Sequence, residues 1–360
     1  MISWRRFAPF LGVGGLLVIV LAYRRLATPV VGAVAEAWYQ KVERRFVSDR
    51  DQLVPPQGAR WFGMYRPELP WNYTRFSQIG TELGIRPRIV SWYQSWGVGD
   101  ASEFKDEAIS KAIAAGLIPL VTWEPWMSSF GPLSVPNPEG SVAYINQGRF
   151  DAYIREWARA AVRVGGPMFL RPFHEMGNPW YQWSTSYGNS PGSLADAWRH
   201  VVRVFREEGA KNVAFVWTPY TKEDNAAWPG DEWVDWIGLD VFNYGALTTQ
   251  GEWTGFGDIM KEQLGHLPPT DKPIMISEIG CSGVGGDRTE WWTEALRSLK
   301  AGQQPRVKAV VVFDNPAHQM ANTSEPVDWG FTHSPDLLPL LHPLAVQAGL
   351  FPEGPSITKD

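Results

Sequence analysis

The sequence holds a single cysteine, Cys281, in 360 residues, which excludes a disulfide bond within the chain. It has no excess of positive charge either, because 33 Lys and Arg residues are set against 38 Asp and Glu residues, a formal net charge of −5. This balance lacks the basic footprint typical of nucleic-acid-binding proteins, and we expect no nucleic-acid partner. Because no disulfide bond within the chain can form, the fold must be held by apolar burial alone.

Motifs for cofactors are also missing. No group of His, Cys and Asp residues has the spacing of a zinc site, and no acidic loop resembles a calcium-binding EF-hand. No Gly-rich phosphate loop follows the first predicted strand. We therefore expect no cofactor and no metal, and no pattern in the sequence points to an obligatory protein partner.

Aromatic residues, in contrast, are plentiful: the chain has 20 Trp, 11 Tyr and 17 Phe. Many stand beside Pro, Gly or Asn rather than inside long apolar runs. A tryptophan ring complements a sugar, because its flat face covers C–H groups and its N–H can bond a hydroxyl. Most tryptophans in proteins belong to the core, so the enrichment by itself is a weak indication of carbohydrate binding.

One apolar run lies near the N-terminus, from Phe7 to Tyr23, with arginine pairs at 5–6 and 24–25. Its length is at the lower limit for a membrane-spanning helix, and the flanking arginines suit a membrane interface. We favour an uncleaved anchor that makes the membrane a partner, with a cleaved signal peptide or a buried core helix as alternatives. We expect an exported protein, either anchored and facing the cell exterior or secreted.

Three segments follow from this pattern. Residues 1–25 are predicted to be a membrane anchor or signal segment, and residues 26–58 a juxtamembrane helix and linker that ends in a Pro-rich stretch. Residues 59–360 are predicted to form the folded domain.

Eight short β-rich runs alternate with longer helical stretches in that domain, which is the pattern of βα units and a parallel sheet. The runs are Trp61–Tyr65, Arg88–Trp92, Ile118–Trp123, Met168–His174, Val213–Trp217, Asp235–Asp240, Ile274–Ser277 and Ala309–Phe313. The clearest helices, at 103–115, 150–164 and 193–208, each stop at a glycine. We predict a (β/α)8 TIM barrel rather than a doubly wound open sheet, because the latter's phosphate loop is missing.

Two of the predicted strands end in glutamate. Glu175 follows the fourth strand and Glu278 follows the seventh. Because catalytic residues of such barrels project from the carboxyl ends of strands, the two side chains are expected to face one pocket. A pair of carboxyl groups is what glycosidic cleavage requires, with retention at about 5–5.5 Å separation and inversion at about 6.5–9.5 Å.

The residues around these glutamates resemble glycoside hydrolase family 26, which includes endo-β-mannanases, β-1,3-1,4-glucanases and β-1,3-xylanases. The likeness extends from about Trp61 to Trp329 and is carried by Arg171, Pro172, His174, Glu175, Met176, Trp180 and Glu278. The resemblance implies that Glu175 is the general acid/base and Glu278 the nucleophile of a retaining double displacement. It also implies that Asp240 is a substrate-contacting or network carboxylate.

The remaining candidates are assigned from residue chemistry. Arg171 is expected to supply a positive charge near the barrel floor, and Trp180 a platform for a sugar ring. His174 is expected to bond a substrate hydroxyl or to orient Glu278. Three further tryptophans close to predicted strand ends are expected to contact sugar: Trp92, Trp123 and Trp126. The resemblance implies the same for Trp217, which fits the family's Trp-x-Pro pattern. Glu124 adds a third carboxylate at the mouth, expected to act as a hydrogen-bonding partner.

The chain departs from the family pattern at two places. Phe242 stands where the family usually has a tyrosine that donates to the nucleophile, so either Tyr244 substitutes or the nucleophile is tuned differently. Gly177 and Asn178 stand in the reverse of the usual order. We expect an endo-β-glycanase acting on β-1,4-mannan or mixed-linkage β-1,3-1,4-glucan. The alternative is a catalytically weakened carbohydrate-binding or transglycosylating barrel that acts in polysaccharide assembly.

Overall fold

The structure is a computed structural model that describes residues 53–97, 100, 102–126, 140–247, 252–300, 303–320, 323, 325–331 and 337–350. The predicted anchor at 1–25 and the juxtamembrane helix lie outside the described residues. Within the described part of the chain, no helix is both long enough and apolar enough to cross a membrane.

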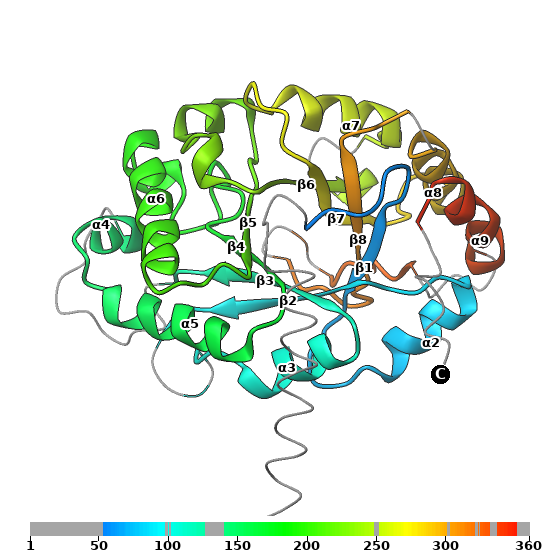
Figure 1. The fold of residues 1–360 in the computed structure, drawn as a ribbon. Coiled ribbons are helices and arrows are strands. Elements are labelled where there is room, and N and C mark those ends of the chain that lie inside the picture. The colour runs from blue at the N-terminus through cyan, green and yellow to red at the C-terminus, as the bar shows by residue number, and fades with distance from the viewer. Residues whose placement is uncertain are drawn as a thin grey trace, which may run out of the picture. The chain divides into compact units, whose positions relative to one another are not determined.

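Eight parallel strands close into a barrel in which β1 pairs with both β2 and β8, as the sequence predicted (Figure 1). The strands are β1 Trp61–Tyr65, β2 Ile89–Ser95, β3 Ile118–Glu124, β4 Met168–Pro172, β5 Val213–Trp217, β6 Trp236–Asn243, β7 Ile274–Cys281 and β8 Val307–Phe313.

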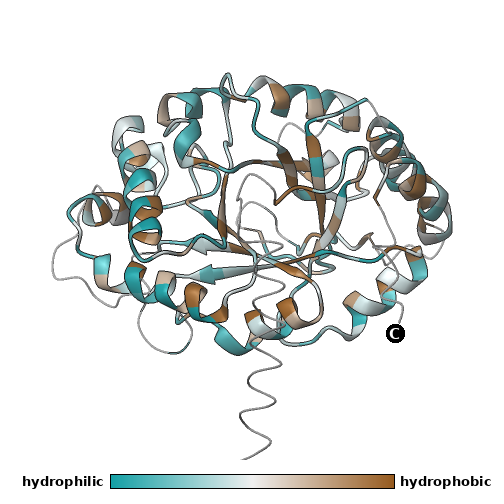
Figure 2. Ribbon diagram, viewed as in Figure 1, coloured by the Kyte–Doolittle hydropathy of each residue, from teal (hydrophilic) through white to brown (hydrophobic). Residues whose placement is uncertain are grey.

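Helices lie between and around the strands, with apolar residues interleaved among polar ones (Figure 2). They are α2 Thr74–Leu83, α3 Asp106–Ala114, α4 Gly140–Asn146, α5 Asp151–Val164, α6 Pro191–Glu207, α7 Phe256–Gly265, α8 Arg288–Ser298 and α9 Leu337–Gln347. Short 3-10 turns are η3 Thr185–Tyr187, η4 Lys222–Ala227, η5 Asp231–Trp233 and η6 Gly245–Leu247. The three predicted glycine stops are confirmed, since Gly116, Gly165 and Gly209 all have φ between 75° and 79°.

Strand residues alternate between the barrel interior and the surrounding helices. One apolar cluster draws residues from all eight strands and from no helix, so it fills the interior: Trp61, Ile89, Ile118, Leu120, Phe169, Ala214, Val216, Trp236, Met275, Ala309 and Val311, with Leu53. The indole N–H of Trp236 donates to the Leu53 carbonyl over 3.2 Å. The residues of opposite parity pack outward in a second cluster shared with the helices.

Gly238 on β6 marks the level at which this interior changes from apolar to polar. A Cβ at this position would lie 2.2 Å from Thr218 Oγ1 and 2.7 Å from Ser277 Oγ. Ser277 is thereby free to donate to Asp240 Oδ1 over 2.7 Å. The missing side chain leaves room for a hydrogen-bonded layer above the core.

We predict that Gly238→Ala lowers the free energy of unfolding by about 1–3 kcal/mol, because the added methyl overpacks the interior. Gly192→Ala is the matched control, since its Cβ would meet nothing within 4 Å and the site is helical. The control is expected to raise the free energy by about 0.5–1 kcal/mol. Urea unfolding measures both, and equal effects of the two substitutions would contradict the steric explanation.

Candidate active site

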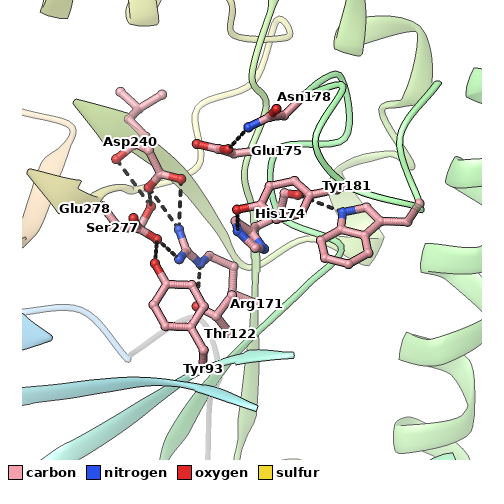
Figure 3. Close-up of polar contacts among 12 residues, drawn as sticks. Tyr93, Thr122, Arg171, His174, Glu175, Asn178, Tyr181, Asp240, Ser277 and Glu278 are labelled. Atoms are coloured by element: carbon pink, nitrogen blue, oxygen red, sulfur yellow. Dashed lines mark hydrogen bonds and ion pairs between the residues drawn. The ribbon is translucent and has the colours of Figure 1, made fainter. Parts of the chain in front are cut away.

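A polar layer lies above the apolar interior, at the carboxyl ends of the strands. Its members, shown in Figure 3, come from the ends of five strands and the loops after them: Tyr93, Thr122, Arg171, His174, Glu175, Asn178, Tyr181, Asp240, Ser277 and Glu278. Both predicted catalytic glutamates and the predicted Arg171, His174 and Asp240 are thus brought together at one end of the barrel.

Arg171 on β4 is the centre of this layer. Its guanidinium is fully buried and donates to Thr122 Oγ1 over 2.9 Å and to both carboxylate oxygens of Asp240 over 2.9 and 3.0 Å. A further N–H, on Nη2, donates to Oε1 of Glu278. One buried cation therefore holds two carboxylates from two other strands, with hydrogen bonds on three sides.

Glu278 reaches Arg171 because β7 carries a bulge. The pairing of β6 with β7 runs from Leu239 opposite Ile276 to Asp240 opposite Glu278, so Ser277 is an extra residue. A bulge lets two successive side chains point to the same side of a sheet. Ser277 and Glu278 accordingly both reach the polar layer, where they contact Asp240 and Arg171.

A second donor to Glu278 comes from β2. The hydroxyl of Tyr93 donates to Oε1 of Glu278 over 2.5 Å. The expected alternative, Tyr244, packs against Phe242 and Trp329 with ring centroids 5.8 and 5.2 Å away. The donor that Phe242 cannot supply is thus provided by a residue that the sequence reasoning did not consider.

Glu175 stands in a turn rather than on a strand. The predicted strand 168–174 ends at Pro172, because Phe173 and Glu175 adopt φ of 50° and 51°. The Glu175 N–H donates to the Thr218 carbonyl over 3.0 Å, which fixes the turn against the end of β5. Such left-handed backbone is unusual for residues with side chains and is typical of functional sites.

The loop after Glu175 explains the reversed Gly-Asn order. Asn178 Nδ2 donates to Glu175 Oε2 over 2.6 Å, and Asn178 Oδ1 accepts the N–H of Trp180 over 3.0 Å. The Gly177 N–H donates to Asp224 Oδ2 over 3.1 Å, and a Cβ at 177 would lie 2.4 Å from Asp224 Oδ1. Glycine therefore suits position 177, and asparagine at 178 contacts the acid/base candidate.

The electrostatic surroundings of the carboxylates differ. Burial, followed by the negative charges of Asp240 and Glu278, raises the pKa of Glu175 well above its usual value. Burial also raises the pKa of Asp240 to about 7, although Arg171 opposes the shift. A carboxyl group held protonated near neutral pH is suited to donate a proton.

His174 is buried and neutral in this layer. Burial and the charge of Arg171 lower its pKa well below the usual value. A 2.8 Å hydrogen bond joins its Nε2 to the hydroxyl of Tyr181, and its carbonyl accepts the indole N–H of Trp183 over 2.9 Å. The partner of His174 is therefore Tyr181 rather than Glu278.

Three of the predicted sugar contacts need correction. Trp92, Trp123 and Trp217 are buried and belong to the outward-facing cluster shared with the helices. Trp123, for example, lies among other aromatic rings, 4.3 Å from Trp96 and 4.6 Å from Trp157 between centroids. Rings without exposed faces cannot stack on a sugar, and these three side chains stabilise the packing outside the barrel.

Other predicted contacts keep accessible surface. Trp180 is 58% exposed, and Trp126 is half-buried beside Tyr181 and Trp183. Tyr244 is half-buried, and burial, followed by the charge of Glu175, raises its pKa well above the usual value. Glu124 also borders the layer, and burial raises its pKa to about 7.

The sequence reasoning missed Tyr93, Asn178 and Asp224. Strand parity was a usable signal for Tyr93, because Ile89 fills the interior and residues two and four positions later share its side. A local signal exists for Asp224 as well, since it follows Thr221 by three residues in a helix capping box and accepts the N–H groups of Tyr220 and Thr221 over 2.6 and 3.1 Å. Its contacts join loops that are far apart in the sequence.

Comparisons with known proteins agree with this geometry. The sequence model of glycosyl hydrolase family 26 matches residues 136–281, a stretch that contains both glutamates. Endoglucanase H of Acetivibrio thermocellus is 30% identical over 273 residues, which cover 72% of this chain and 27% of that protein. The chain belongs to glycosyl hydrolase family 26.

Two further relatives show the breadth of the family. The β-1,3-xylanase TXYA of a Vibrio species is 29% identical over 214 residues, 56% of this chain and 43% of the relative. The family 26 β-mannanase of Bacteroides ovatus shares the fold with a TM-score of 0.59 at 18% identity, over 86% of this chain and 94% of the other. This chain spans less than half the length of the endoglucanase and the xylanase.

We predict that Arg171→Met lowers the free energy of unfolding by about 3–5 kcal/mol at pH 7, because Asp240 and Glu278 would lose their buried counter-charge. Arg171 lowers the pKa of Asp240, so without it the carboxyl group takes up a proton more readily as pH falls. The difference in the free energy of unfolding between wild type and variant should therefore become smaller toward acidic pH.

Denaturant unfolding at several pH values measures that gap. The control is Arg75→Met, which removes a surface pair with Glu82 at 2.7 Å and is expected to cost at most about 1 kcal/mol. A gap for Arg171→Met that stays constant with pH would show that lost packing, not charge, causes the loss.

Proposed function

We propose that the protein is a retaining endo-β-glycanase that works by double displacement through a glycosyl-enzyme intermediate. The observation that carries the proposal is the contrast between the two glutamates. Glu175 has a raised pKa and bonds a neutral amide, whereas Glu278 accepts from a guanidinium and a phenol. One group is suited to protonate the departing oxygen and the other to attack the anomeric carbon.

The reaction follows from these positions. Glu175 gives its proton to the glycosidic oxygen while Glu278 forms a bond to the anomeric carbon and the aglycone leaves. Glu175, now a carboxylate, takes a proton from water, which attacks the same carbon and releases Glu278. The pair of inversions gives net retention. Asp240, whose charge raises the pKa of Glu175, favours the proton-loaded form that begins the cycle.

For the substrate we propose a β-linked polysaccharide, with mixed-linkage β-1,3-1,4-glucan first and β-1,4-mannan second. Endoglucanase H matches 72% of this chain and the mannan endo-1,4-β-mannosidase of Bacillus subtilis 34%, which favours a glucan over a mannan. Trp180 and Tyr220, 58% and 41% exposed, offer ring faces on the loops after β4 and β5. Exposed rings beside the reacting groups suit stacking on a chain of sugars.

The proposed place of action is outside the cytoplasm, anchored or secreted. It rests on the apolar run from Phe7 to Tyr23 and the arginine pairs around it. Polymers of this kind are too large to enter a cell intact, so an exported enzyme suits such a substrate.

We predict that wild type releases reducing sugar from at least one of three polymers, β-1,3-1,4-glucan, β-1,4-mannan and β-1,3-xylan. Glu175→Gln should lower that rate about 10²–10⁴-fold, because no acid remains. Glu278→Gln should abolish it, since no glycosyl-enzyme can form. The control is Glu262→Gln on the exposed surface of α7, which should match wild type.

Proton NMR of the first product gives the stereochemistry. A β-anomer is expected for retention, and an α-anomer would contradict the double displacement. If wild type and both glutamate variants bind a polymer equally but release no sugar, the chain is a binding protein instead. Longer products from defined oligosaccharides would reveal transglycosylation.

The acid role of Glu175 also predicts a pH dependence. Because Glu175 must carry a proton in the first step, kcat/KM should fall as pH rises through its raised pKa. The Asn178 amide lowers that pKa by bonding the charged form. Asn178→Ala should therefore move the alkaline limb of the profile to higher pH.

Measurement of kcat/KM against pH for both proteins checks this shift. The control Asn146→Ala removes an amide that bonds Ser193 at the surface and should leave the profile where it is. A shift of the alkaline limb to lower pH in Asn178→Ala would contradict the assignment.

A further inference from the structure

The two donors to Glu278 meet at a single atom. Tyr93 donates its hydroxyl to Oε1 over 2.5 Å, and Arg171 donates Nη2–H to the same Oε1. Neither donor reaches Oε2. The two oxygens of the carboxylate are therefore unequal, since one is anchored from below by β2 and β4 side chains (Figure 3).

From this asymmetry we propose that Tyr93 is a positioning residue that makes Oε2 the attacking oxygen and speeds release of Glu278 from the glycosyl-enzyme. The inference rests on the proposed function and deepens it. It assigns to a residue of β2 the hydroxyl contact that family 26 enzymes usually take from the position of Phe242.

Tyr93 is rigidly held for such a role. Its ring makes edge contacts with Tyr65 at 5.1 Å and His174 at 5.9 Å between centroids. Burial and the charge of Glu278 raise its pKa well above the usual value, so the phenol keeps its proton and acts as a donor. A neutral phenol and a carboxylate can bond in only one direction, from oxygen–hydrogen to oxyanion.

The position on β6 is filled by apolar packing instead. Phe242 stands opposite Gly280 in the sheet register, and a Cβ on Gly280 would lie 3.0 Å from its ring. Its ring also packs 4.9 Å from Trp329 and 5.4 Å from Phe313 between centroids. The apolar packing of Phe242 and the hydroxyl contact of Tyr93 are therefore complementary: one position lacks the donor and the other supplies it.

The second chemical step shows what the donor does. In the intermediate, Oε2 is bonded to the anomeric carbon and Oε1 is the ester carbonyl. Water attacks that carbon and gives a proton to Glu175, and the carbon–Oε2 bond breaks with its electron pair going to Glu278. Donors at Oε1 bind the resulting carboxylate more strongly than the ester. They therefore lower the activation barrier for cleavage of the glycosyl ester.

Loss of the hydroxyl should therefore slow the second step more than the first. The variant Tyr93→Phe keeps the ring contacts and removes one hydrogen bond to a charged group, worth about 10- to 100-fold in rate. The probe is the 2,4-dinitrophenyl β-glycoside of the disaccharide from whichever polymer the enzyme degrades. Its leaving group needs no acid, so breakdown of the intermediate limits turnover.

The expected result for Tyr93→Phe is a fall of about 10- to 100-fold in kcat, together with a fall in KM. A burst of one equivalent of dinitrophenolate and a glycosyl adduct on Glu278 by intact-protein mass spectrometry should accompany it. A residue with only a structural role would raise KM or reduce the burst. Tyr65→Phe, the neighbouring ring, is the control and should change kcat less than about threefold.

Failure of the inference and failure of the proposed function give different experimental results. If wild type turns over the probe but Tyr93→Phe shows a lower kcat with higher KM and no burst, the role of Tyr93 is overturned alone. The role of Tyr93 is also overturned if Tyr93→Phe and Tyr65→Phe change kcat and KM equally. If wild type turns over neither probe nor polymer, the proposed function is overturned, and the role of Tyr93 falls with it.

Discussion

The guanidinium of Arg171 is the interaction on which the active end of the barrel depends. It joins Thr122 on β3, Asp240 on β6 and Glu278 on β7 to its own strand β4. Removing charges from water is costly, and a protein in which apolar residues replace a whole buried ion cluster is often as stable or more stable. Loss of one member alone is destabilising, because its partners stay buried without their counter-charge. Arg171 is therefore poorly explained by stability alone. What it supplies is a fixed geometry for two carboxylates that would otherwise repel each other.

That cation gives the carboxyl groups different surroundings. Glu278 and Asp240 accept its N–H groups directly, while Glu175 stands in a separate turn and contacts the amide of Asn178. Glu175 feels the negative charge of both other groups more than the positive charge of Arg171, so its proton is retained. Two carboxyl groups with different surroundings are the arrangement by which one fold provides both an acid and a nucleophile.

The strands, their number and the strand-end glutamates could be predicted from sequence, because period-two apolar runs and glycine stops are local signals. The tryptophans could not be placed by proximity to strand ends. Trp92 and Tyr93 are neighbours, yet parity sends one outward and the other to Glu278. Parity itself fails where Ser277 adds a bulge and where Phe173 turns to positive φ, and neither feature has a recognisable residue pattern. The capping box of Asp224 is a local signal, but its contact with the Gly177 N–H is long-range and could not be predicted from the sequence.

The departures from the family pattern also bear on whether the barrel retains chemistry. Loss of a tyrosine at 242 would by itself indicate a weakened nucleophile, but Tyr93 supplies a donor from another strand. Reversal of Gly177 and Asn178 would by itself indicate a disturbed loop after Glu175. In this chain Asp224 accepts the Gly177 N–H, and the Asn178 amide donates to Glu175. A barrel that only bound sugar would gain nothing from either compensation, because exposed rings suffice for stacking. A buried ion cluster in which each missing contact is replaced is expected where the contacts serve a reaction.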